Sequence, residues 1–338
     1  MILYERSGTE MKRIVPVLLA IALLLSACAA QTSESAAATA SQVTDETVAA
    51  PKLEESAAIT FTDDRGREVT VEQPERVAVL IGSFVDIWCL AGGADSLVAA
   101  ANDAWTSFDN LPLEGVTNIG SSKDLNLELI IASDPDFIIA SCNTALDIEL
   151  EPTFASMGVP TAYFEVSTFD QYLHMLDICT QITGNRGAYQ IHGTEIQAQV
   201  DAAMGRADGS SPKVLYIRSS SSSCKVKNSE GSVLGEMLRD MGCVNIADSD
   251  TGLLENLSIE AIMVDDPDAI FLVYQSADPS VAEETFRKTL GTDPAWASLR
   301  AVKEGRVYVM DQKMFNLKPN AKWGDAYEQL ADILYPAA

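Results

Sequence analysis

The sequence predicts an α/β fold of two similar lobes, and three observations support this prediction. One segment occurs twice in the same register, at residues 126–139 and 258–271, so that Glu128 and Glu260 occupy equivalent positions. A single repetition about one domain length apart indicates two related lobes, because a solenoid needs at least three short repeats. Strand-like apolar runs alternate with helical patterns, which is typical of parallel sheets covered by helices. A long helical stretch separates the two halves.

Each copy of the repeat predicts a short helix that leads into a central parallel strand. Asn126 and Ser258 are favourable N-cap residues, and Glu128 and Glu260 follow in the first turn, where the helix dipole favours negative charge. Each helix should end at Asp-Pro-Asp, because proline lacks an N–H and keeps the residue before it out of the α region. An apolar run follows in both copies, as expected of a strand that is buried on both faces.

The N-terminus predicts export and lipid anchoring. Two basic residues precede an apolar run that is too short to span a membrane and that Pro16 interrupts, which is typical of a signal peptide. The run ends in Leu-Ser-Ala-Cys, similar to a bacterial lipobox, so residues 1–28 are expected to be a lipoprotein signal peptide ending at lipidated Cys28. The alternative is an ordinary secretory signal with a chance cysteine. The pattern leaves open whether translation starts at Met1 or Met11.

Composition limits what the rest of the chain can do. Residues 29–58 contain almost no large apolar side chain and are expected to form a disordered tether. The formal net charge of −26 argues against nucleic acid as a partner, because phosphates would be repelled. The five cysteines after Cys28 have irregular spacings and no Cys-x-x-Cys pair, which indicates neither a zinc site nor a disulfide framework. Their oxidation state stays open.

The body divides into three predicted parts: an N-terminal α/β lobe at residues 59–167, an inter-lobe helical region at 168–211, and a C-terminal α/β lobe at 212–338. In the first lobe, the pattern predicts a hairpin, a buried strand, a helix and a further strand, at residues 59–71, 76–81, 83–91 and 158–164. In the second lobe it predicts a first strand, a last strand and a closing helix, at residues 213–217, 305–310 and 323–334.

The inter-lobe region should contain two helices. Apolar residues recur near a period of 3.6 between Tyr172 and Ile182, which indicates an amphipathic helix. A break at residues 183–187 precedes a second helix, at residues 188–204. We interpret this second helix as spanning both lobes and limiting how far they can move.

These features together resemble the iron-complex and vitamin B12 type of ABC-transporter substrate-binding protein. The resemblance covers nearly everything after residue 59 and rests on the order of several segments: 63–77, 158–160, 234–245, 296–308 and the two Glu-to-Asp-Pro-Asp repeats. It implies two Rossmann-like lobes joined by one long rigid helix, with a ligand cleft between the lobes. It also implies a monomer that captures a chelated metal such as a ferric siderophore. With the predicted lipidated Cys28, this monomer would be anchored by lipid to the outside of the bacterial cell membrane. The partner would be an ABC permease dimer with its ATPase.

The resemblance also assigns a role to the repeated glutamates. In that family, a glutamate near the start of a helix in each lobe pairs with arginines of the permease, and Glu128 and Glu260 stand at the matching places. A two-fold permease would present two equivalent charged patches. The alternative is that both glutamates only complement the helix dipole.

The candidate ligand residues lie in loops expected at the cleft: Trp105, Ser122, Arg218, Ser219, Phe315 and Lys318. Arg218 and Lys318 could hold carboxylate or phenolate oxygens through charge-assisted hydrogen bonds, or they could be solvated charges. Trp105 could stack on a ligand or pack on its own lobe. A corrinoid or haem is the alternative ligand, and it would need broad aromatic walls.

Other functions are less well supported by the residues. The only histidines, His174 and His192, fall in the helical region, so neither a bare metal ligand nor a cofactor of the protein's own is expected. No Gly-x-Ser-x-Gly, P-loop or His-Glu-x-x-His motif is present, and no nucleophile–base pair can be argued for a lipid-anchored enzyme. A sensor subunit that reports ligand to a membrane kinase cannot be separated from a transport protein by sequence.

Overall fold

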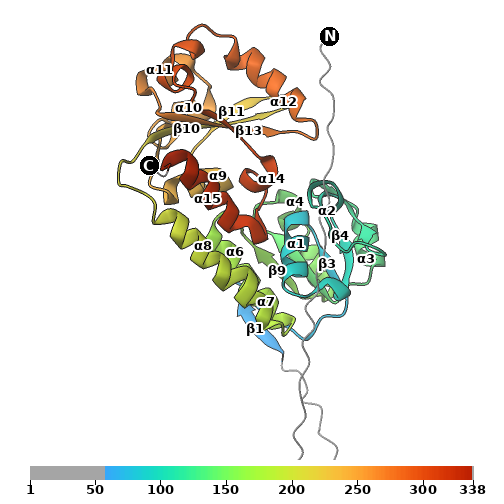
Figure 1. Cartoon of the computed structure of the whole chain (residues 1–338). Coiled ribbons are helices and arrows are strands. Elements are labelled where there is room, and N and C mark those ends of the chain that lie inside the picture. Colours follow the sequence, from blue (N-terminus) through green and yellow to red (C-terminus); the bar gives the residue numbers. More distant parts are fainter. Residues whose placement is uncertain (1–57, 337–338) are drawn as a thin grey trace, which may run out of the picture. The chain divides into compact units, whose positions relative to one another are not determined.

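A computed structural model describes residues 58–336 of the chain (Figure 1). The predicted signal peptide, lipidated Cys28 and all but the last residue of the predicted tether lie outside these residues. Within the described part, no helix is both long and apolar enough to cross a membrane. The predicted α/β fold of two lobes is confirmed, because each lobe is built on its own five-stranded sheet.

The first lobe contains a parallel sheet with the strand order β5-β4-β3-β8-β9. Its strands are β3 (Val77–Val79), β4 (Leu97–Ala100), β5 (Thr117–Asn118), β8 (Phe137–Ser141) and β9 (Thr161–Phe164). Its helices are α1 (Gly82–Leu90), η1 (Ala94–Ser96), α2 (Asp103–Ser107), α3 (Leu127–Ala132), α4 (Ala145–Glu149) and α5 (Glu151–Met157). Two small antiparallel hairpins accompany the sheet: β1 (Ile59–Thr62) with β2 (Glu68–Val71), and β6 (Gly120–Ser121) with β7 (Asp124–Leu125).

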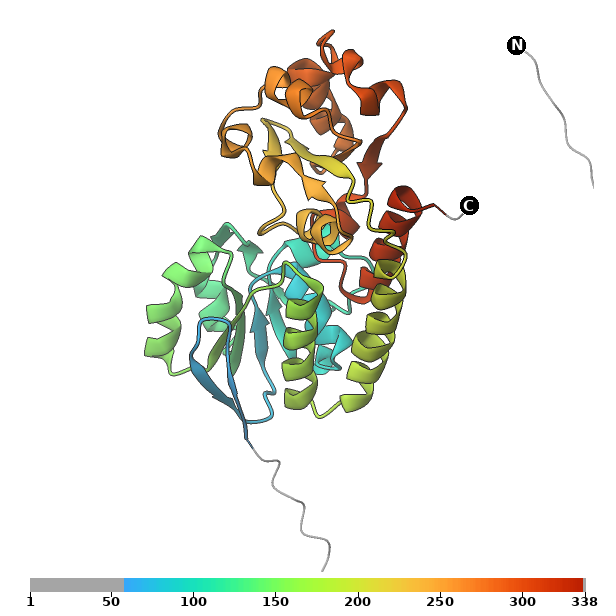
Figure 2. The ribbon, with the colours of Figure 1, turned by 90° about the vertical axis from the view of Figure 1, so that its left-hand side faces the viewer.

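The connecting region consists of α6 (Phe169–Ile182), α7 (Arg186–Tyr189), the π-helical segment η2 (Gln190–Thr194) and α8 (Glu195–Met204). The second predicted helix is therefore continuous, but it contains a π turn that the sequence pattern did not indicate. Tyr172 of α6 donates its hydroxyl to the carbonyl oxygen of His192 (2.9 Å), which gives a carbonyl in this turn a partner outside its own helix. Figure 2 shows α6 and α8 side by side, and α15 (Trp323–Leu334) packs against α8.

The second lobe contains a sheet with the order β11-β10-β13-β14, and β12 also pairs with β10. Its strands are β10 (Lys213–Ser220), β11 (Cys224–Lys227), β12 (Val244–Asn245), β13 (Ala269–Gln275) and β14 (Val307–Met310). Before β14 come α9 (Val233–Asp240), η3 (Ile246–Asp248), α10 (Thr251–Glu255), α11 (Ile259–Asp265), α12 (Pro279–Phe286), η4 (Arg287–Gly291), η5 (Trp296–Ser298) and α13 (Arg300–Lys303). After it come α14 (Gln312–Phe315), η6 (Asn320–Lys322) and α15.

The second sheet is not purely parallel as predicted, because β11 pairs with β10 antiparallel. β10 also continues beyond the predicted end at residue 217, and the serine run after it closes a hairpin. The backbone N–H of Ser220 donates to the carbonyl of Ser223 (2.8 Å), and the Ser220 hydroxyl accepts from the N–H of Ser223 (3.1 Å). A run of serines is typical of a loop, so only the pairing of the two strands reveals this hairpin.

The repeat predicted from sequence forms equivalent structures in the two lobes. Asn126 Oδ1 accepts from the N–H of Leu129 (3.1 Å), and Ser258 Oγ accepts from the N–H of Ala261 (3.2 Å), so both helices are capped in the same way. The strands that follow, β8 and β13, are central in their sheets, and β8 is buried throughout.

The ends of the two repeats agree as well. Asp134 and Asp266, which precede the prolines, both have a left-handed backbone, with φ of 46° and 41°. The next aspartate ties the repeat to the first strand of its sheet in each lobe: Asp136 Oδ1 accepts from the N–H of Arg76 (3.0 Å), and Asp268 Oδ2 accepts from that of Lys213 (2.8 Å). The Asp-Pro-Asp motif is therefore a repeated joint between helix and sheet.

One cluster of buried apolar residues is continuous from the first lobe to the second. It includes Val79 of β3, Tyr172 of α6, Tyr216 of β10, Phe271 of β13 and Trp323 of α15. The rings of Tyr172 and Trp323 lie 6.3 Å apart between centroids. Each lobe has a further apolar cluster of its own. A shared core opposes separation of the lobes, because opening would expose apolar surface to water.

Candidate functional site

The segment after β14, residues 311–322, joins the second lobe to the first. Asn320 Nδ2 donates to the carbonyl of Ser83 (2.9 Å) and to Asp86 Oδ2 (2.8 Å), and Lys313 Nζ forms an ion pair with Asp109 Oδ2 (2.7 Å). Beside these contacts lie two cavities of about 420 and 660 Å3, which share several lining residues: Ser107, Asp311 and Lys313. A cleft next to the carboxyl ends of sheet strands is a usual place for a ligand in an α/β protein, so it is the candidate site.

On the first-lobe side of this cleft, the backbone at the start of α1 packs closely against the backbone of α2. Asp103 Oδ2 accepts from the N–H of Gly82 at the start of α1 (2.9 Å). A Cβ added to Gly82 would lie 2.5 Å from the backbone nitrogen of Ala104, so only glycine allows this approach. The other oxygen, Asp103 Oδ1, is buried without a partner among the described residues. Burial raises the pKa of Asp103, while the nearby Lys318 charge acts in the opposite direction.

Two of the predicted ligand residues stay at the surface of the first lobe. Trp105 lies on α2 with 36% of its surface exposed, next to Thr106 and Ser107, which line the larger cavity. Ser122 is half-buried in the turn between β6 and β7. Neither Trp105 nor Ser122 lines the two cavities directly.

Lys318 lines the smaller cavity, but carboxylates of the first lobe already face it. Its pKa is lowered first by burial, and the charges of Asp103 and Glu165 oppose that effect. The positive charge of Lys318 is therefore partly compensated by two carboxylates that belong to the first lobe. A ligand anion would have to compete with these two carboxylates for it.

Arg218 and Ser219 lie within β10 rather than in a loop, and they point to opposite faces of the sheet. Arg218 is half-buried, and its Nη1 donates to Asn316 Oδ1 (3.2 Å) in the segment that joins the lobes. Ser219 is buried and donates its hydroxyl to the carbonyl of Ala282 (2.8 Å) in α12. Strand alternation thus turns Ser219 away from the cleft side.

Phe315 does not reach the cleft surface either. It lies at the end of α14, is fully buried and belongs to the apolar cluster that the lobes share. The loop in which we expected Phe315 contains the helical turn α14 instead, which directs this ring into the core. The structure therefore brings Arg218 and Lys318 to the lobe boundary, and it does not bring Ser219 or Phe315 there.

Sequence reasoning missed the side chains that organise the cleft. Asp103 and Asn320 lie in segments expected at the cleft, but neither was a candidate residue, because each gains its role only from contacts distant in sequence, with Gly82 and with Ser83. Asn320 is fully buried with a positive φ of 52°, a conformation that asparagine tolerates better than most residues. An asparagine after proline was the only signal available.

Asp147 is a buried residue of α4, next to the carboxyl end of β8 in the first sheet. Its Oδ2 accepts from the N–H of Ser141 (2.8 Å), and its Oδ1 has no partner within residues 58–336. Burial raises the pKa of Asp147 to about 7, the Asp103 charge adds to this rise, and the Ser141 hydrogen bond opposes it. The carboxyl is therefore most stable in its neutral form.

Asp147→Asn is expected to stabilise the protein at pH 8 and to leave its stability unchanged at pH 4. The folded-state pKa lies above the unfolded value, so the protonated carboxyl stabilises the fold at low pH, and this contribution is lost between about pH 4 and pH 7. Neutral asparagine avoids the loss, worth about 1–3 kcal/mol at pH 8. Thermal unfolding at both pH values measures the change, with the exposed Asp124→Asn as control. Equal melting temperatures at pH 8 would contradict it.

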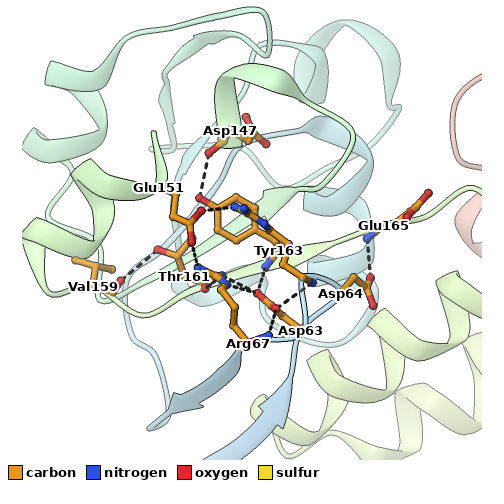
Figure 3. Close-up of polar contacts among 10 residues, drawn as sticks. Asp63, Asp64, Arg67, Asp147, Glu151, Val159, Thr161, Tyr163 and Glu165 are labelled. Carbon is orange, nitrogen blue, oxygen red and sulfur yellow. Dashed lines mark hydrogen bonds and ion pairs between the residues drawn. The ribbon is translucent and has the colours of Figure 1, made fainter. Parts of the chain in front are cut away.

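A cluster of polar side chains lies at the β1–β2 hairpin of the first lobe (Figure 3). The Asp63 carboxylate accepts from the backbone N–H groups of Arg65 (3.0 Å), Arg67 (2.9 Å) and Tyr163 (3.2 Å) and from the Arg67 guanidinium (2.6 Å). Arg67 also pairs with Glu151 (2.7 Å) and lies over the Tyr163 ring. These charges satisfy one another, and they fasten the hairpin to β9. Arg67 and Glu151 also line a cavity of about 390 Å3.

Metal-binding groups are scattered. Within residues 58–336, no three His, Cys, Asp or Glu side chains are grouped so as to hold a metal ion. The cysteines described there are free thiols: Cys89, Cys142, Cys179, Cys224 and Cys243. His174 lies near Asp64 (3.4 Å) on the outer side of α6.

The two repeated glutamates are exposed on the first turns of α3 and α11. The pKa of Glu260 is lowered by hydrogen bonds from its own backbone N–H and from the Ser258 hydroxyl (3.0 Å), so this carboxylate is charged at neutral pH. Exposed apolar side chains follow each glutamate on the same helix. Ile131 is 49% exposed and Met263, at the equivalent position of the repeat, is 43% exposed. Two matching surface patches result, one in each lobe.

Comparisons with known proteins agree with this architecture. A family model described as periplasmic binding protein matches residues 77–314, which is more than half of the chain. YhfQ of Bacillus subtilis strain 168, a candidate ABC transporter substrate-binding lipoprotein, is 23% identical over 297 residues, 83% of this chain and 89% of YhfQ.

Two solved structures illustrate the shared fold. The periplasmic haem-binding protein RhuT from Roseiflexus sp. RS-1, in its apo form, has a TM-score of 0.62 and 20% identity, over 77% of this chain and 98% of RhuT. SirA of Staphylococcus aureus, complexed with staphyloferrin B, has a TM-score of 0.61 and 21% identity, over 82% of this chain and 97% of SirA.

Proposed function

The chain belongs to the periplasmic binding protein family, and from this premise we propose that it is the extracytoplasmic substrate-binding component of an ABC importer. It captures a chelated metal, such as a ferric siderophore, in the cleft between its lobes and releases it unchanged to the permease. The observation that carries the proposal is the cleft itself, whose two cavities are lined from both lobes and by the segment 311–322. The printed names of YhfQ and SirA support it, the first as a transporter lipoprotein and the second by its siderophore complex.

The choice of an anionic chelate rests on charge. The chain has a formal net charge of −26, yet Arg218 and Lys318 lie at the lobe boundary. Guanidinium and ammonium groups hold carboxylate and phenolate oxygens strongly in a partly desolvated site. Haem is the second candidate ligand, favoured by the exposed Trp105 ring and by the likeness to RhuT. A corrinoid is a further alternative ligand, and it would leave the proposed importer class unchanged.

The partners follow from the two glutamate patches. Glu128 and Glu260 dock on the two equivalent subunits of a permease dimer, which works with its ATPase, and the exposed Ile131 and Met263 extend the contact. The protein acts as a monomer held outside the cell membrane by lipid on Cys28.

Titration of the purified protein against ferric siderophores, haem and cobalamins tests the ligand class. Tryptophan fluorescence, corrected for absorption by each chromophore, reports binding, because Trp105 lies beside the cleft. Saturable binding of a ferric chelate without response to the macrocycles supports the proposal. Tight binding of haem or cobalamin instead keeps the importer function and overturns the choice of ligand.

Arg218→Ala is expected to weaken an anionic ferric chelate by about 1.5–3 kcal/mol, the scale of a hydrogen bond to a charged group. This corresponds to a rise in Kd of about 10- to 100-fold. The control is Arg287→Ala, which removes an exposed arginine from η4 in the same lobe. Isothermal titration calorimetry measures both variants. An unchanged Kd in Arg218→Ala would remove Arg218 from the site.

A further inference from the structure

The two cavities of the candidate cleft are neighbours that share part of their walls. Their volumes are about 420 and 660 Å3, and the residues that line both are Ser107 of α2, Asp311, and Lys313 of α14. In Figure 1, α14 lies beside α2 where the two lobes meet. Each volume alone is in the usual range for a small-molecule site in a protein. A ligand that fills both cavities would have to displace whatever lies between them.

The helical turn α14 is held firmly on the second lobe. Asp311 Oδ1 accepts from the N–H of Met314 (3.0 Å) and so caps the turn. Gln312 Oε1 accepts from the N–H of Ser276, just after β13 (3.2 Å). Phe315 is buried in the apolar cluster that the lobes share. These contacts fix the backbone of the turn, so any movement at this point of the cleft belongs to its side chains.

The Lys313 side chain is the movable part of the shared wall. It is 49% exposed, and its ammonium reaches across the lobe boundary to Asp109 Oδ2 (2.7 Å), on a side chain that is 76% exposed. The hydrogen bond and the charge of Lys313 lower the pKa of Asp109, so both partners are charged at neutral pH. An exposed ion pair holds its partners weakly, because water and salt compete for both charges. The long, flexible stem of lysine lets the ammonium swing into solvent when the pair breaks.

We propose that Lys313 and Asp109 form a removable partition that selects ligands by size. While the ion pair is closed, the Lys313 side chain divides the cleft, and each cavity admits only a ligand of its own size. When the pair opens, the cavities join, and one larger ligand occupies both. The other two shared residues do not serve as the partition, because Ser107 is short and the Asp311 carboxylate caps α14. This inference rests on the proposed function, because it deepens the choice of ligand at the same cleft.

The experiment titrates the purified protein with two dyes of the same chemistry and different size, anilinonaphthalene sulfonate and its covalent dimer, whose fluorescence rises on binding. The quantity compared is the affinity for the dimer divided by the affinity for the monomer. Asp109→Asn frees Lys313, and Lys313→Ala removes the partition. In both variants this ratio is expected to rise about two- to fivefold, the scale of an exposed ion pair. The two substitutions change the local charge in opposite directions, so a rise in both reports the partition and not the charge.

Two control variants accompany the titration. Lys313→Arg keeps a cation opposite Asp109 and is expected to keep the ratio of the wild type. Glu114→Gln removes an exposed carboxylate of the first lobe that lines neither cavity, and it is also expected to keep that ratio. A ratio that stays at the wild-type value in Asp109→Asn and Lys313→Ala would overturn the inference.

A crystal structure of Lys313→Ala without ligand tests the partition directly, and it decides if neither dye binds. One continuous cavity supports the inference. Two separate cavities would overturn it, because another group would then divide the cleft. Neither measurement uses a metal chelate. Failure of chelate binding would therefore count against the proposed function alone, and an unchanged dye ratio would count against the partition alone.

Discussion

Reversing both repeated glutamates, Glu128→Arg with Glu260→Arg, is expected to abolish ligand import while leaving the Kd of the ligand unchanged. Both side chains are exposed on α3 and α11, outside the cleft, so the substitutions leave the ligand contacts in place. They also replace attraction to cationic permease patches by repulsion, and like-charge contacts across an interface cost several kcal/mol. Uptake of radiolabelled ferric chelate by cells measures import, and calorimetry on the purified protein measures affinity.

The matched control is Glu72→Arg with Glu255→Arg. It makes the same charge change at one exposed glutamate in each lobe, outside the repeat. Import by this control should match the wild type. Lost ligand affinity in the Glu128–Glu260 variant would refute the docking assignment, and normal import would refute it equally. Single reversals should each reduce import, because a two-fold permease engages both lobes.

Asp63→Ala is expected to destabilise the protein by about 3–5 kcal/mol, the range for breaking a buried charged network. The Asp63 side chain is fully buried, and its loss leaves the N–H groups of Arg65, Arg67 and Tyr163 without their acceptor. Arg67 keeps Glu151 as partner, so the hairpin should loosen at its turn before it detaches from β9. Chemical denaturation followed by circular dichroism measures the change in the free energy of unfolding.

Two further variants calibrate this result. Asp63→Asn keeps one carbonyl acceptor and should lose less stability than Asp63→Ala. Glu68→Ala removes an exposed carboxylate from β2 and should change the free energy of unfolding by no more than about 0.5 kcal/mol. A loss below about 1 kcal/mol in Asp63→Ala would show that the turn holds its shape without this carboxylate.

The repeat was predictable from sequence because its determinants are local. An N-cap side chain bonds to an N–H three residues ahead, and proline restricts the residue next to it, so Asn126, Ser258 and the two Asp-Pro-Asp motifs act without help from the rest of the fold. The β1–β2 hairpin was predictable for a similar reason, since its alternating apolar residues and its turn lie close together in sequence.

The site was predicted less completely. Arg218 was expected at the lobe boundary. The sequence pattern, however, predicted that β10 ends at residue 217, and it gave no indication that β10 pairs with β11. Without that pairing, nothing indicated that Lys225 and Lys227 share a face with Arg218, or that Ser219 points the other way. Phe315 was expected in a loop, and the α14 turn places it in the core instead.

The sequence by itself determined the two-lobed α/β architecture, the capped helices of the repeat and the positions of Glu128 and Glu260, because these depend on periodicity and on contacts between near neighbours. Only the tertiary structure decided which polar groups meet: Asp103 with Gly82, Asn320 with Ser83, and Lys313 with Asp109. Such contacts join residues far apart in the chain. They depend on strand register and close packing, which a one-dimensional pattern of residue types does not contain.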